Sequence, residues 1–536
     1  MMLKSRRTLQ LALAAMSALP LVAQAQNAAA PGQQNAVVTT EAYHDHSPSL
    51  RGITPLPDAY YSGGGHVHEV KAIPHIDAPG FVIDSAAQTT PISGAAATTA
   101  GLGFDGVGNG FTGPAGAFTV NSAPPDTTGA IGATQYVQWV NSSFAVFDKA
   151  TGNAVYGPAP GNTLWKGFGG VCETSNDGDP IVQYDKAAGR WVMMQFAVPT
   201  GGPYFQCVAV SQTSDATGAY NRYAFQYSGF NDYPKVGVWP DGYYVTYNVF
   251  NGNTFAGANV CAFDRAKMLA GTAATQQCVQ LSSSYGGVLP ADVDGITAPP
   301  AGSPEYLVNK GSSALNFWKY HVDWANTANT TLTGPTSIPV TAFNAACGGG
   351  SCIPQAGTSN KLDSLADRLM FRLAYRNFGT HESLVVNHSV AVGATRKTTY
   401  AAVRWYELRN LSGTPTVYQQ STYAPDNTFR WMGSVAMDKM GNMALGYSTS
   451  SSTTHPGIRY ATRLAGDAVN TLSNETVVVQ GAGSQTGTLH RWGDYTQMSV
   501  DPVDDCTFWY TGEYLKADGT FNWSTRIASF KIAGCQ

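Results

Sequence analysis

The chain has 536 residues and a formal net charge of −4, and only 12% of its residues are charged. Its 58 glycines, 29 prolines and 11% aromatic residues argue against a helical protein and favour strands, because aromatic and β-branched side chains fit half-buried pleated surfaces. No run of basic residues follows the N-terminal region, so a nucleic-acid partner has no support.

The first 25 residues have the pattern of a signal peptide. Lys4, Arg6 and Arg7 form a basic start, residues 9–22 form an apolar core, and residues 23–25 fit a cleavage site. The arginine pair also resembles a twin-arginine signal, although such pairs are common in ordinary signal peptides. The apolar core is too short to span a membrane, and no later run is long enough. We therefore expect export to the periplasm or out of the cell, with no membrane span.

Residues 26–113 are rich in Ala, Gly, Pro, Ser and Thr and lack sustained periodicity. We interpret them as an irregular, low-complexity arm or linker that precedes a main domain of residues 114–536. The arm contains His44-x-His46 and His66-x-His68. Such pairs can bind a metal, although histidines in segments of this kind are more often simply solvated.

After residue 124 a unit with a polar start, a strand, a turn and a second strand recurs. Turns at residues 148–152 and 185–189 share the pattern Asp-Lys-x-x-Gly, in which Asp bonds to its own backbone and Gly supplies a positive φ. The units start roughly 50 to 75 residues apart, which leaves room for four short strands in each. Their starting residues are Asp126, Asp179, Tyr233, Asp294, Asp367, Met432 and Asp494.

Four-stranded repeats with this period predict an all-β protein, a β-propeller of seven four-stranded blades preceded by the irregular arm. A blade cannot bury both faces alone, so packing around a ring would supply the core. The copy at Asp294 is weak, which leaves six or eight blades open. An array of β-sandwiches is the structural alternative.

Eight cysteines fit an oxidising compartment. Many pairings are possible. We predict bonds between sequence neighbours, because each bond then lies inside one repeat. A zinc site is the alternative, but the CxxC spacing is absent. The predicted disulfides are Cys172–Cys207, Cys261–Cys278, Cys347–Cys352 and Cys506–Cys535.

Three sequence runs, at residues 368–379, 381–388 and 491–502, resemble uncharacterised bacterial exported β-propeller proteins of the sialidase/BNR-like type. The resemblance covers roughly residues 115–536 and implies a propeller without implying an activity. The Asp-Lys-x-x-Gly turn is similar to the Asp-box turn of sialidases. The full Ser/Thr-x-Asp-x-Gly-x-Thr-Trp pattern of that turn is absent.

In a propeller the first strand of each blade lines the channel, so the residues that open these strands should meet at one channel mouth. Acids, arginines and aromatic rings together suit a sugar, because carboxylates act as acid, base or nucleophile, rings stack on pyranose faces and Arg binds anionic groups. The predicted catalytic residues are Asp179, Asp367, Asp494 and His381. The predicted substrate-binding residues are Arg368, Arg430, Trp431, Arg491, Trp492 and Tyr233.

The same acids can have other uses. An aspartate that opens a blade strand can bond to backbone amides of the next blade and so close the ring. Asp126 and Asp294 are predicted ligands of a hard cation such as Ca²⁺, because carboxylate oxygens suit such ions; the proposed chemistry requires no cofactor. Sialidase chemistry needs three arginines around a carboxylate. Arg372, Arg404, Arg430 and Arg491 with Glu513 can be forced into that pattern, but the missing Asp boxes and the seventh blade weigh against it.

Two functions remain. The first is an exported carbohydrate-active enzyme, a glycoside hydrolase or lyase, that acts on a polysaccharide, such as an acidic one, at the channel mouth. The alternative is a non-catalytic carbohydrate- or protein-binding module of the cell surface or the secreted fraction, in which the same residues close the ring or hold a cation. We expect a monomer in either case. Motifs of serine esterases, zincins, P-loop nucleotide sites and c-type haem attachment are absent.

Overall fold

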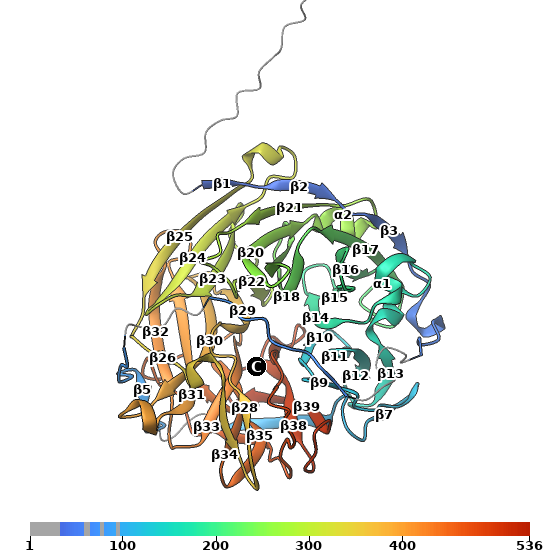
Figure 1. Ribbon diagram of the computed structural model, residues 1–536. Coiled ribbons are helices and arrows are strands. Elements are labelled where there is room, and N and C mark those ends of the chain that lie inside the picture. The colour runs from blue at the N-terminus through green and yellow to red at the C-terminus, as the bar shows by residue number, and fades with distance from the viewer. Residues whose placement is uncertain (1–32, 58–64, 75–79, 93–96) are drawn as a thin grey trace, which may run out of the picture.

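A computed structural model describes residues 33–57, 65–74, 80–92 and 97–536, so the predicted signal peptide lies outside the described residues. The described chain is predominantly β-structure, with two short α-helices, α1 (Gly170–Thr174) and α2 (Arg265–Ala270). None of the described helices has the length and hydrophobicity of a membrane span. Sheets follow one another around a central axis, the arrangement of a β-propeller (Figure 1).

The ring is built of four-stranded antiparallel meanders that run from the axis outward, and in all but the last of them the four strands follow one another in the chain. The first contains β10 (Thr128–Ile131), β11 (Gln135–Val140), β12 (Ser143–Asp148) and β13 (Ala154–Pro160). The second contains β14 (Gly178–Asp185), β15 (Arg190–Ala197), β16 (Tyr204–Ser211) and β17 (Tyr220–Tyr227). The third contains β18 (Phe230–Val238), β19 (Tyr243–Asn251), β20 (Thr254–Phe263) and β21 (Thr275–Gln280).

The next two meanders form one continuous sheet, because β22 pairs in parallel with β29 over four residues. The first consists of β22 (Leu289–Asp294), β23 (Glu305–Lys310), β24 (Ala314–His321) and β25 (Thr331–Pro339). The second consists of β29 (Met370–Asn377), β30 (Glu382–Val392), β31 (Tyr400–Arg409) and β32 (Thr416–Tyr423). Between them lie β26 (Asn344–Ala345), which pairs with β30, and a hairpin of β27 (Ser351–Gln355) and β28 (Thr358–Asp363).

The last two sheets bring the chain back to the first. One contains β33 (Phe429–Met437), β34 (Met443–Ser451), β35 (Thr454–Arg463) and β36 (Thr476–Val479). The other contains β37 (Gln497–Val500), β38 (Thr507–Leu515), β39 (Trp523–Ile532) and β6 (Thr98–Asp105). The first strand of each meander contacts the first strand of the next, and β37 contacts β10. The first strands therefore surround the axis.

Aromatic rings fill the space between neighbouring sheets. Phe225 of β17 stacks on Phe263 of β20 with centroids 4.5 Å apart, and Tyr460 of β35 stacks on Phe530 of β39 at 3.7 Å. Both sides of such a sheet are buried, which explains why its strands lack a strict alternation of apolar and polar residues. The many aromatic residues of the sequence therefore form the core between the sheets.

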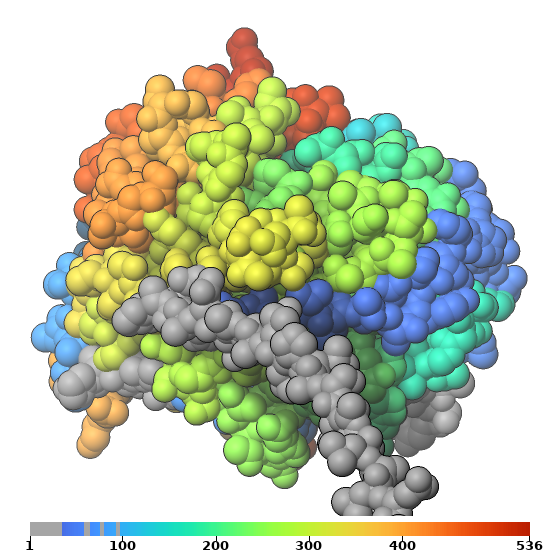
Figure 2. Space-filling model, turned by 90° about the horizontal axis from the view of Figure 1, so that it is seen from above, coloured from blue at the N-terminus to red at the C-terminus, as the bar shows by residue number. Residues whose placement is uncertain are grey.

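The N-terminal arm is more regular than predicted. Three short strands, β1 (Gln33–Asn35), β2 (Val37–Thr40) and β3 (Tyr43–His46), pair with the outer strands β25, β21 and β17 in turn. Further along, β5 (Ala87–Gln88) pairs with β32, and β6 completes the last sheet. Strand β6 thus lies before residue 114, the expected start of the main domain. Figure 2 shows the arm, in blue, against the rim of the ring.

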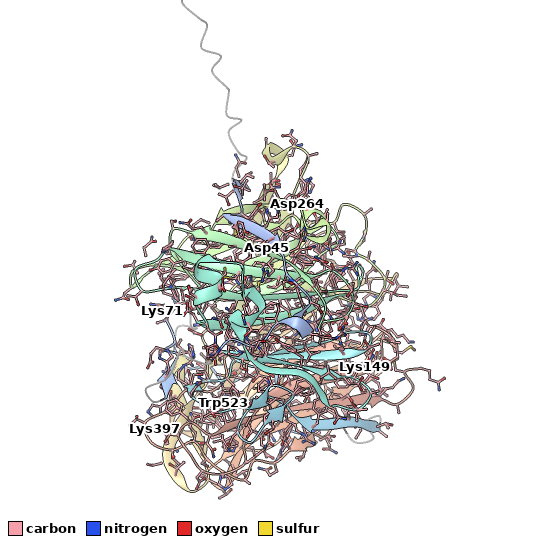
Figure 3. All side chains as sticks on the ribbon, turned by 90° about the vertical axis from the view of Figure 1, so that its right-hand side faces the viewer. Asp45, Lys71, Lys149, Asp264, Lys397 and Trp523 are labelled. Carbon is pink, nitrogen blue, oxygen red and sulfur yellow. A yellow bond between two sulfur atoms is a disulfide. The ribbon has the colours of Figure 1, made fainter. Side chains whose placement is uncertain are left out.

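Between β3 and β5 the arm passes over one end of the ring (Figure 1). There β4 (His66–Val67) pairs in parallel with β9 (Ser122–Ala123). A small hairpin of β7 (Thr112–Gly113) and β8 (Gly116–Ala117) precedes the first meander. Lys71 of the arm and Lys149 of the first sheet lie at opposite faces of the ring (Figure 3). Residues near them mark the two ends of the channel.

The four predicted disulfides are confirmed. Cys261–Cys278 joins β20 to β21, and Cys506–Cys535 joins the two ends of the β38–β39 pair. These two bonds stay within one sheet, as the spacing of the cysteines suggested. Cys172 of α1 precedes the predicted repeat start Asp179, so its bond to Cys207 of β16 crosses that start. Cys347–Cys352 lies in the connection between two meanders. All eight cysteines lie among the described residues, and none is free.

Removal of the long-range disulfide should destabilise the protein more than removal of the short one. Cys506 and Cys535 are 29 residues apart and Cys347 and Cys352 are 5 apart, and the loop-entropy model assigns such bonds roughly 3.5 and roughly 2 kcal/mol. The double Cys→Ala variants of each pair, unfolded by urea without reductant, test this. Equal losses in the free energy of unfolding would contradict it.

Candidate functional site

The two ends of the channel differ in chemistry. The first strands run in the same direction along the axis, so their first residues lie at one end and their last residues at the other. We call the first end the acid mouth. It consists of Asp126, Asp179, Asp232, Tyr233, Arg368, Arg491 and Asp494, covered by residues 68–71 of the arm. We call the other end the turn mouth, because the turns that follow the first strands form it.

The residues of the acid mouth share an unusual backbone conformation. Asp126, Asp179 and Tyr233 have φ values of 44°, 46° and 55°, in the left-handed region that non-glycine residues seldom adopt. Met432, another predicted repeat start, has a φ of 47°. The ladders of β14, β18 and β33 shift register at these residues. The positive φ recurs at four of the seven predicted repeat starts and the ladder shift at three of these, which supports the predicted repeat register there.

Arg491 organises the mouth. Its guanidinium donates to Asp363 at 2.8 Å, to Asp494 at 2.7 Å and to the carbonyl of His68 in the arm at 2.7 Å. The amide of Asp494 in turn donates to Asp126 at 2.7 Å, across the boundary between the last and first sheets. One arginine thus links the channel acids, the inserted hairpin and the arm.

The other polar side chains at the mouth form separate hydrogen bonds and ring contacts. Arg368 donates to both carboxylate oxygens of Asp367, at 2.7 and 2.9 Å, and lies 4.5 Å from the ring centroid of Tyr233. Tyr495 donates to Asp179 at 3.0 Å. Lys235 is completely buried, with Nζ 3.1 Å from the Tyr233 centroid and 3.5 Å from the Tyr495 centroid. Burial lowers the pKa of Lys235 well below its usual value.

The crowded carboxyl groups resist ionisation. Burial, and then the neighbouring acids, raise the pKa of Asp126 well above its usual value and raise that of Asp179. Burial, followed by the charge of Asp179, raises the pKa of Asp232 from 3.8 to about 7. Oδ1 of Asp494 is buried and accepts no hydrogen bond among the described residues. The mouth thus holds a carboxyl that keeps a proton near neutral pH beside a carboxylate with an unused acceptor.

A chain of polar groups fills the channel behind the acid mouth. Gln497 donates to Gln183 at 3.2 Å, and Gln183 donates to Asp292 at 2.9 Å. Arg372 then donates to Asp292 at 2.7 Å and to Asp294 at 2.6 Å. All five side chains are buried. No ligand can reach the acid mouth through a channel packed in this way.

The structure brings together most of the predicted channel residues. Asp126, Asp179, Tyr233, Arg368, Arg491 and Asp494 meet at the acid mouth, and Asp367 joins them through its pair with Arg368.

Asp294 does not belong to this end. It closes β22 instead of opening it and pairs with Lys186 and Arg372 near the turn mouth. Asp126 and Asp294 therefore cannot bind one cation, which corrects the predicted pair of ligands. Within the described ranges, no group of three or more His, Cys, Asp or Glu side chains is arranged to hold a metal ion.

Four other predicted residues take different positions. Trp431 and Trp492 are buried against each other with centroids 5.6 Å apart, so neither face is open to a sugar. Arg430 is buried in ion pairs with Asp426 and Glu475. His381 lies in the loop after β29, at the turn end, and stacks on Phe378 at 4.9 Å. Arg430 and Trp431 are adjacent in β33 and point to opposite faces of it, so they cannot both face the channel.

The arginines required for sialidase chemistry do not converge. Arg372 pairs with Asp292 and Asp294, whereas Arg404 pairs with Asp84 of the arm. Arg430 and Arg491 each have separate acidic partners, as described above. The fold thus offers no site with three arginines around one carboxylate drawn from this set.

Three members of the site were not predicted. Asp232 precedes Tyr233-Pro234 as Gly178 precedes Asp179-Pro180, so an alignment on the prolines would have placed it at the mouth. Asp363 belongs to the inserted hairpin, outside the repeats. Residues 68–71 belong to the arm, and no pattern in their sequence indicates where they lie.

Comparisons with known proteins locate no close relative. No family model matches the chain, and no curated protein matches it. Among solved structures, the N-terminal domain of Nup159 has a TM-score of 0.38 and 8% identity over 82% of this chain and 97% of that chain. An exo-beta-1,3-galactanase from Phanerochaete chrysosporium has a TM-score of 0.29 and 12% identity over 80% and 97%. An endo-arabinase from Bacteroides thetaiotaomicron has a TM-score of 0.28 and 15% identity over 52% and 92%. Likenesses this remote carry no argument about the activity of this chain.

Replacement of Arg372 should be costly, because Arg372→Met leaves Asp292 and Asp294 buried without their common partner. Loss of one member of such a buried group costs roughly 3–5 kcal/mol. The matched control is Arg51→Ala, since the Arg51 side chain is 64% exposed and an exposed pair such as Arg51–Asp215 contributes about 1 kcal/mol at most. Urea unfolding of both variants measures the difference, and similar losses would contradict the role given to Arg372.

Asp232 should make stability depend on pH. Its pKa is higher in the folded protein, at about 7, than its ordinary value of 3.8, so the folded state binds this proton more tightly. Its contribution to the free energy of unfolding is complete below about pH 4 and is lost as the pH rises through about 7. Wild type should therefore lose stability relative to Asp232→Asn between those values. If the two proteins differ in free energy of unfolding by the same amount at pH 4 and at pH 7, the pKa of Asp232 is not raised.

Proposed function

We propose that the protein is an exported carbohydrate-active enzyme, a glycoside hydrolase or lyase, whose reactive groups lie at the acid mouth. The observation that carries this proposal is the juxtaposition of Asp232, with its pKa raised to about 7, and Asp494, with its free carboxylate oxygen. Cleavage of a glycosidic bond uses a carboxyl that donates a proton together with a second carboxylate that acts as base or nucleophile.

Each group then has a chemical role. Asp232 donates the proton to the leaving oxygen, and Asp494 or Asp179 supplies the second carboxylate. Arg368 and Arg491 hold an anionic group of the substrate, as on an acidic polysaccharide. The ring of Tyr233 offers an apolar contact. No cofactor takes part in these steps.

Access to this centre requires movement of the arm. The closed cavity measures about 20 Å³, which is room for about one water molecule and far too little for a sugar ring. Several interactions hold residues 66–71 there. The His66 and His68 amides donate to the Asn121 and Ala123 carbonyls at 2.9 and 2.8 Å, Arg491 donates to the His68 carbonyl, and Lys71 lies 5.1 and 5.4 Å from the rings of Phe230 and Phe250. A substrate can enter only when these contacts break.

The second candidate is a non-catalytic binding module. The arm over the mouth favours it, as do the bonds that occupy Asp126, which accepts from Asn141 at 2.8 Å and from the Asp494 amide. In that case the acids close the ring. The open surfaces of the molecule then carry the function.

We also propose seven blades, each with one of the seven meanders. The meanders β22–β25 and β29–β32 count as two blades that share a parallel contact, and β6 supplies the outer strand of the seventh. Four disulfides are consistent with export, and nothing in the described chain calls for a second copy.

A screen of neutral and acidic polysaccharides tests the activity. Wild type should release reducing or unsaturated ends from at least one of them, and Asp232→Asn and Asp494→Asn should lower that rate on the order of 10²-fold or more. Asp148→Asn, at an exposed turn after β12, is the matched control and should retain the rate. His68→Pro removes the amide bond to Ala123 and should raise the rate by freeing the mouth.

The opposite results are equally informative. If neither wild type nor His68→Pro cleaves any polysaccharide, the acid mouth is not a catalytic centre and the binding module is the better description. If Asp232→Asn cleaves as fast as wild type, the assigned proton donor is wrong even where an activity exists.

A further inference from the structure

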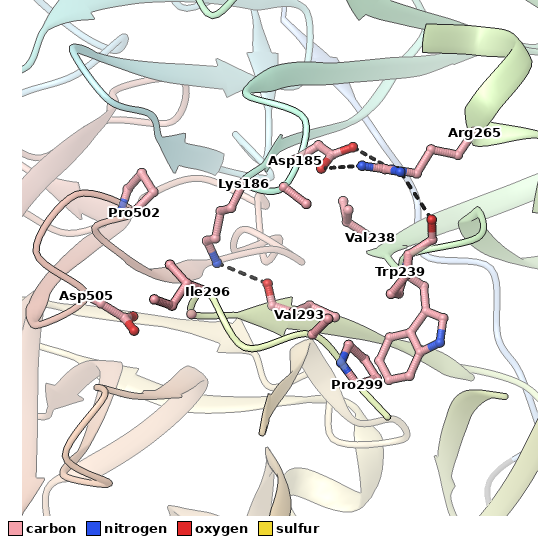
Figure 4. Close-up of a pocket in the computed structure, with 14 residues that line it drawn as sticks. Asp185, Lys186, Val238, Trp239, Arg265, Val293, Ile296, Pro299, Pro502 and Asp505 are labelled. Carbon is pink, nitrogen blue, oxygen red and sulfur yellow. Dashed lines mark hydrogen bonds and ion pairs between the residues drawn. The ribbon is translucent and has the colours of Figure 1, made fainter. Parts of the chain in front are cut away.

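The turn mouth contains a pocket that is separate from the acid mouth (Figure 4). Its volume is about 260 Å³, and the turns that follow β14, β18, β22 and β37 surround it. Apolar side chains dominate its wall, among them Val238, Val293, Ile296, Pro299 and Pro502. It shares no residue with the acid mouth, so a ligand bound here is independent of the function proposed above.

The charged groups in the wall are already paired. Arg265 donates to the two carboxylate oxygens of Asp185 at 2.7 and 3.0 Å (Figure 4). The other pairs are Lys186 with Asp294 and Asp505 with Arg376. A charged ligand would have to break one of these pairs or enter without a partner, and both are costly. The pocket therefore suits an uncharged ligand.

The rim of the pocket continues as exposed aliphatic surface. Ile296 is 89% exposed and borders the pocket, and Val503, next to Pro502, is 68% exposed. Met440 is 55% exposed, and its turn reaches the same rim through a hydrogen bond from the Lys439 amide to the Asp505 carbonyl. Apolar side chains gathered around a pocket mark a surface for another protein. A small molecule in the pocket would leave these side chains in water.

A sugar fits this pocket poorly. Trp239 is the one aromatic side chain among the lining residues, and it is only 2% exposed. Its ring packs edge-to-face against Tyr306 and Tyr375, with centroids 5.6 and 4.8 Å away. No aromatic face is left for a pyranose ring to stack on.

The polar groups of the wall suit a peptide backbone. Arg265 also donates to the Pro240 carbonyl at 3.1 Å, and Lys186 donates to the Val293 carbonyl at 3.1 Å. A guanidinium carries five N–H donors and an ammonium three, so these bonds and the ion pairs leave at least one donor on each side chain. Such donors can bind peptide carbonyls without disturbing the pairs.

We propose that the turn mouth binds an uncharged, extended segment of another protein. One aliphatic or prolyl side chain of this segment fills the pocket, its carbonyls accept from Arg265 and Lys186, and its flanking residues cover Ile296, Val503 and Met440. The energy of such interfaces is concentrated in a side chain anchored in a pocket, with the surrounding contacts excluding water.

A phage-displayed random peptide library, selected on the full-length protein, tests the proposal. The enriched sequences should be uncharged and share an aliphatic or prolyl residue. A synthetic peptide of the best sequence should bind Ile296→Asp about tenfold or more weakly than wild type, because its anchor would meet a charge. Ala298→Phe, which narrows the pocket from an exposed position, should have a similar effect.

Two matched controls separate the pocket from general stickiness. Ile83 and Val477 are 69% and 52% exposed and lie away from the turn mouth, so Ile83→Asp and Val477→Asp should bind the peptide as wild type does. The proposal is overturned if no sequence is enriched, if the enriched sequences are charged, if Ile296→Asp binds the peptide as tightly as wild type, or if neutral oligosaccharides displace it. An unchanged midpoint of thermal unfolding verifies that each variant is folded.

Discussion

The ring depends on the junction between its last and first sheets. Strand β6 pairs with β39 of the last sheet, and the chain then runs on into β10 of the first. Polar bonds complete the junction. Gln497 accepts from Thr128 at 2.7 Å and from the Gly129 amide at 3.0 Å, and Gln138 donates to Thr511 at 2.8 Å. Because these groups are buried in the closed ring, they have given up their hydrogen bonds to water, and the bonds across the junction replace those lost bonds.

The same requirement explains the chemistry at the acid mouth. Asp126 and Asp494 meet there because the first and last of the first strands start side by side, and Arg491 neutralises the charge that results. Burial raises the pKa values of Asp126, Asp179 and Asp232, which gives the site a proton to donate, and the burial of these acids also costs stability. The arm completes the arrangement by excluding water. The residues that close the ring are therefore also the residues that could carry out chemistry.

The sequence predicted the structure best at features that recur with the repeat or lie close together in the chain. The spacing of the units located four equivalent positions of positive φ, and the local cysteine pairs located the disulfides. The prediction was wrong at Asp294, because the weakest repeat was aligned by an acid at the end of β22 instead of its start. It was also wrong for Trp431, since the sequence of a strand that is buried on both sides does not reveal which face a ring occupies, and for Trp492, whose ring packs on Trp431 from the segment before β37.

The arm could not be predicted for a different reason. Strand β2 has exposed side chains and pairs with β21 through its backbone, with one added side-chain bond from Gln276 to Thr39 at 3.0 Å, so its sequence carries no hydrophobic pattern. The sheet edges that the strands of the arm cover can be recognised only in the folded structure. Outer strands with free amide and carbonyl groups are templates for aggregation, and the arm covers these edges on several sheets in succession.

The position of β6 has a consequence for biosynthesis. This strand is made long before its partner β39, which spans Trp523–Ile532. The final sheet cannot form until β39 has left the ribosome. A chain with such distant pairings folds slowly. Strand β6 therefore remains without its partner in the ring while the intervening sheets are made.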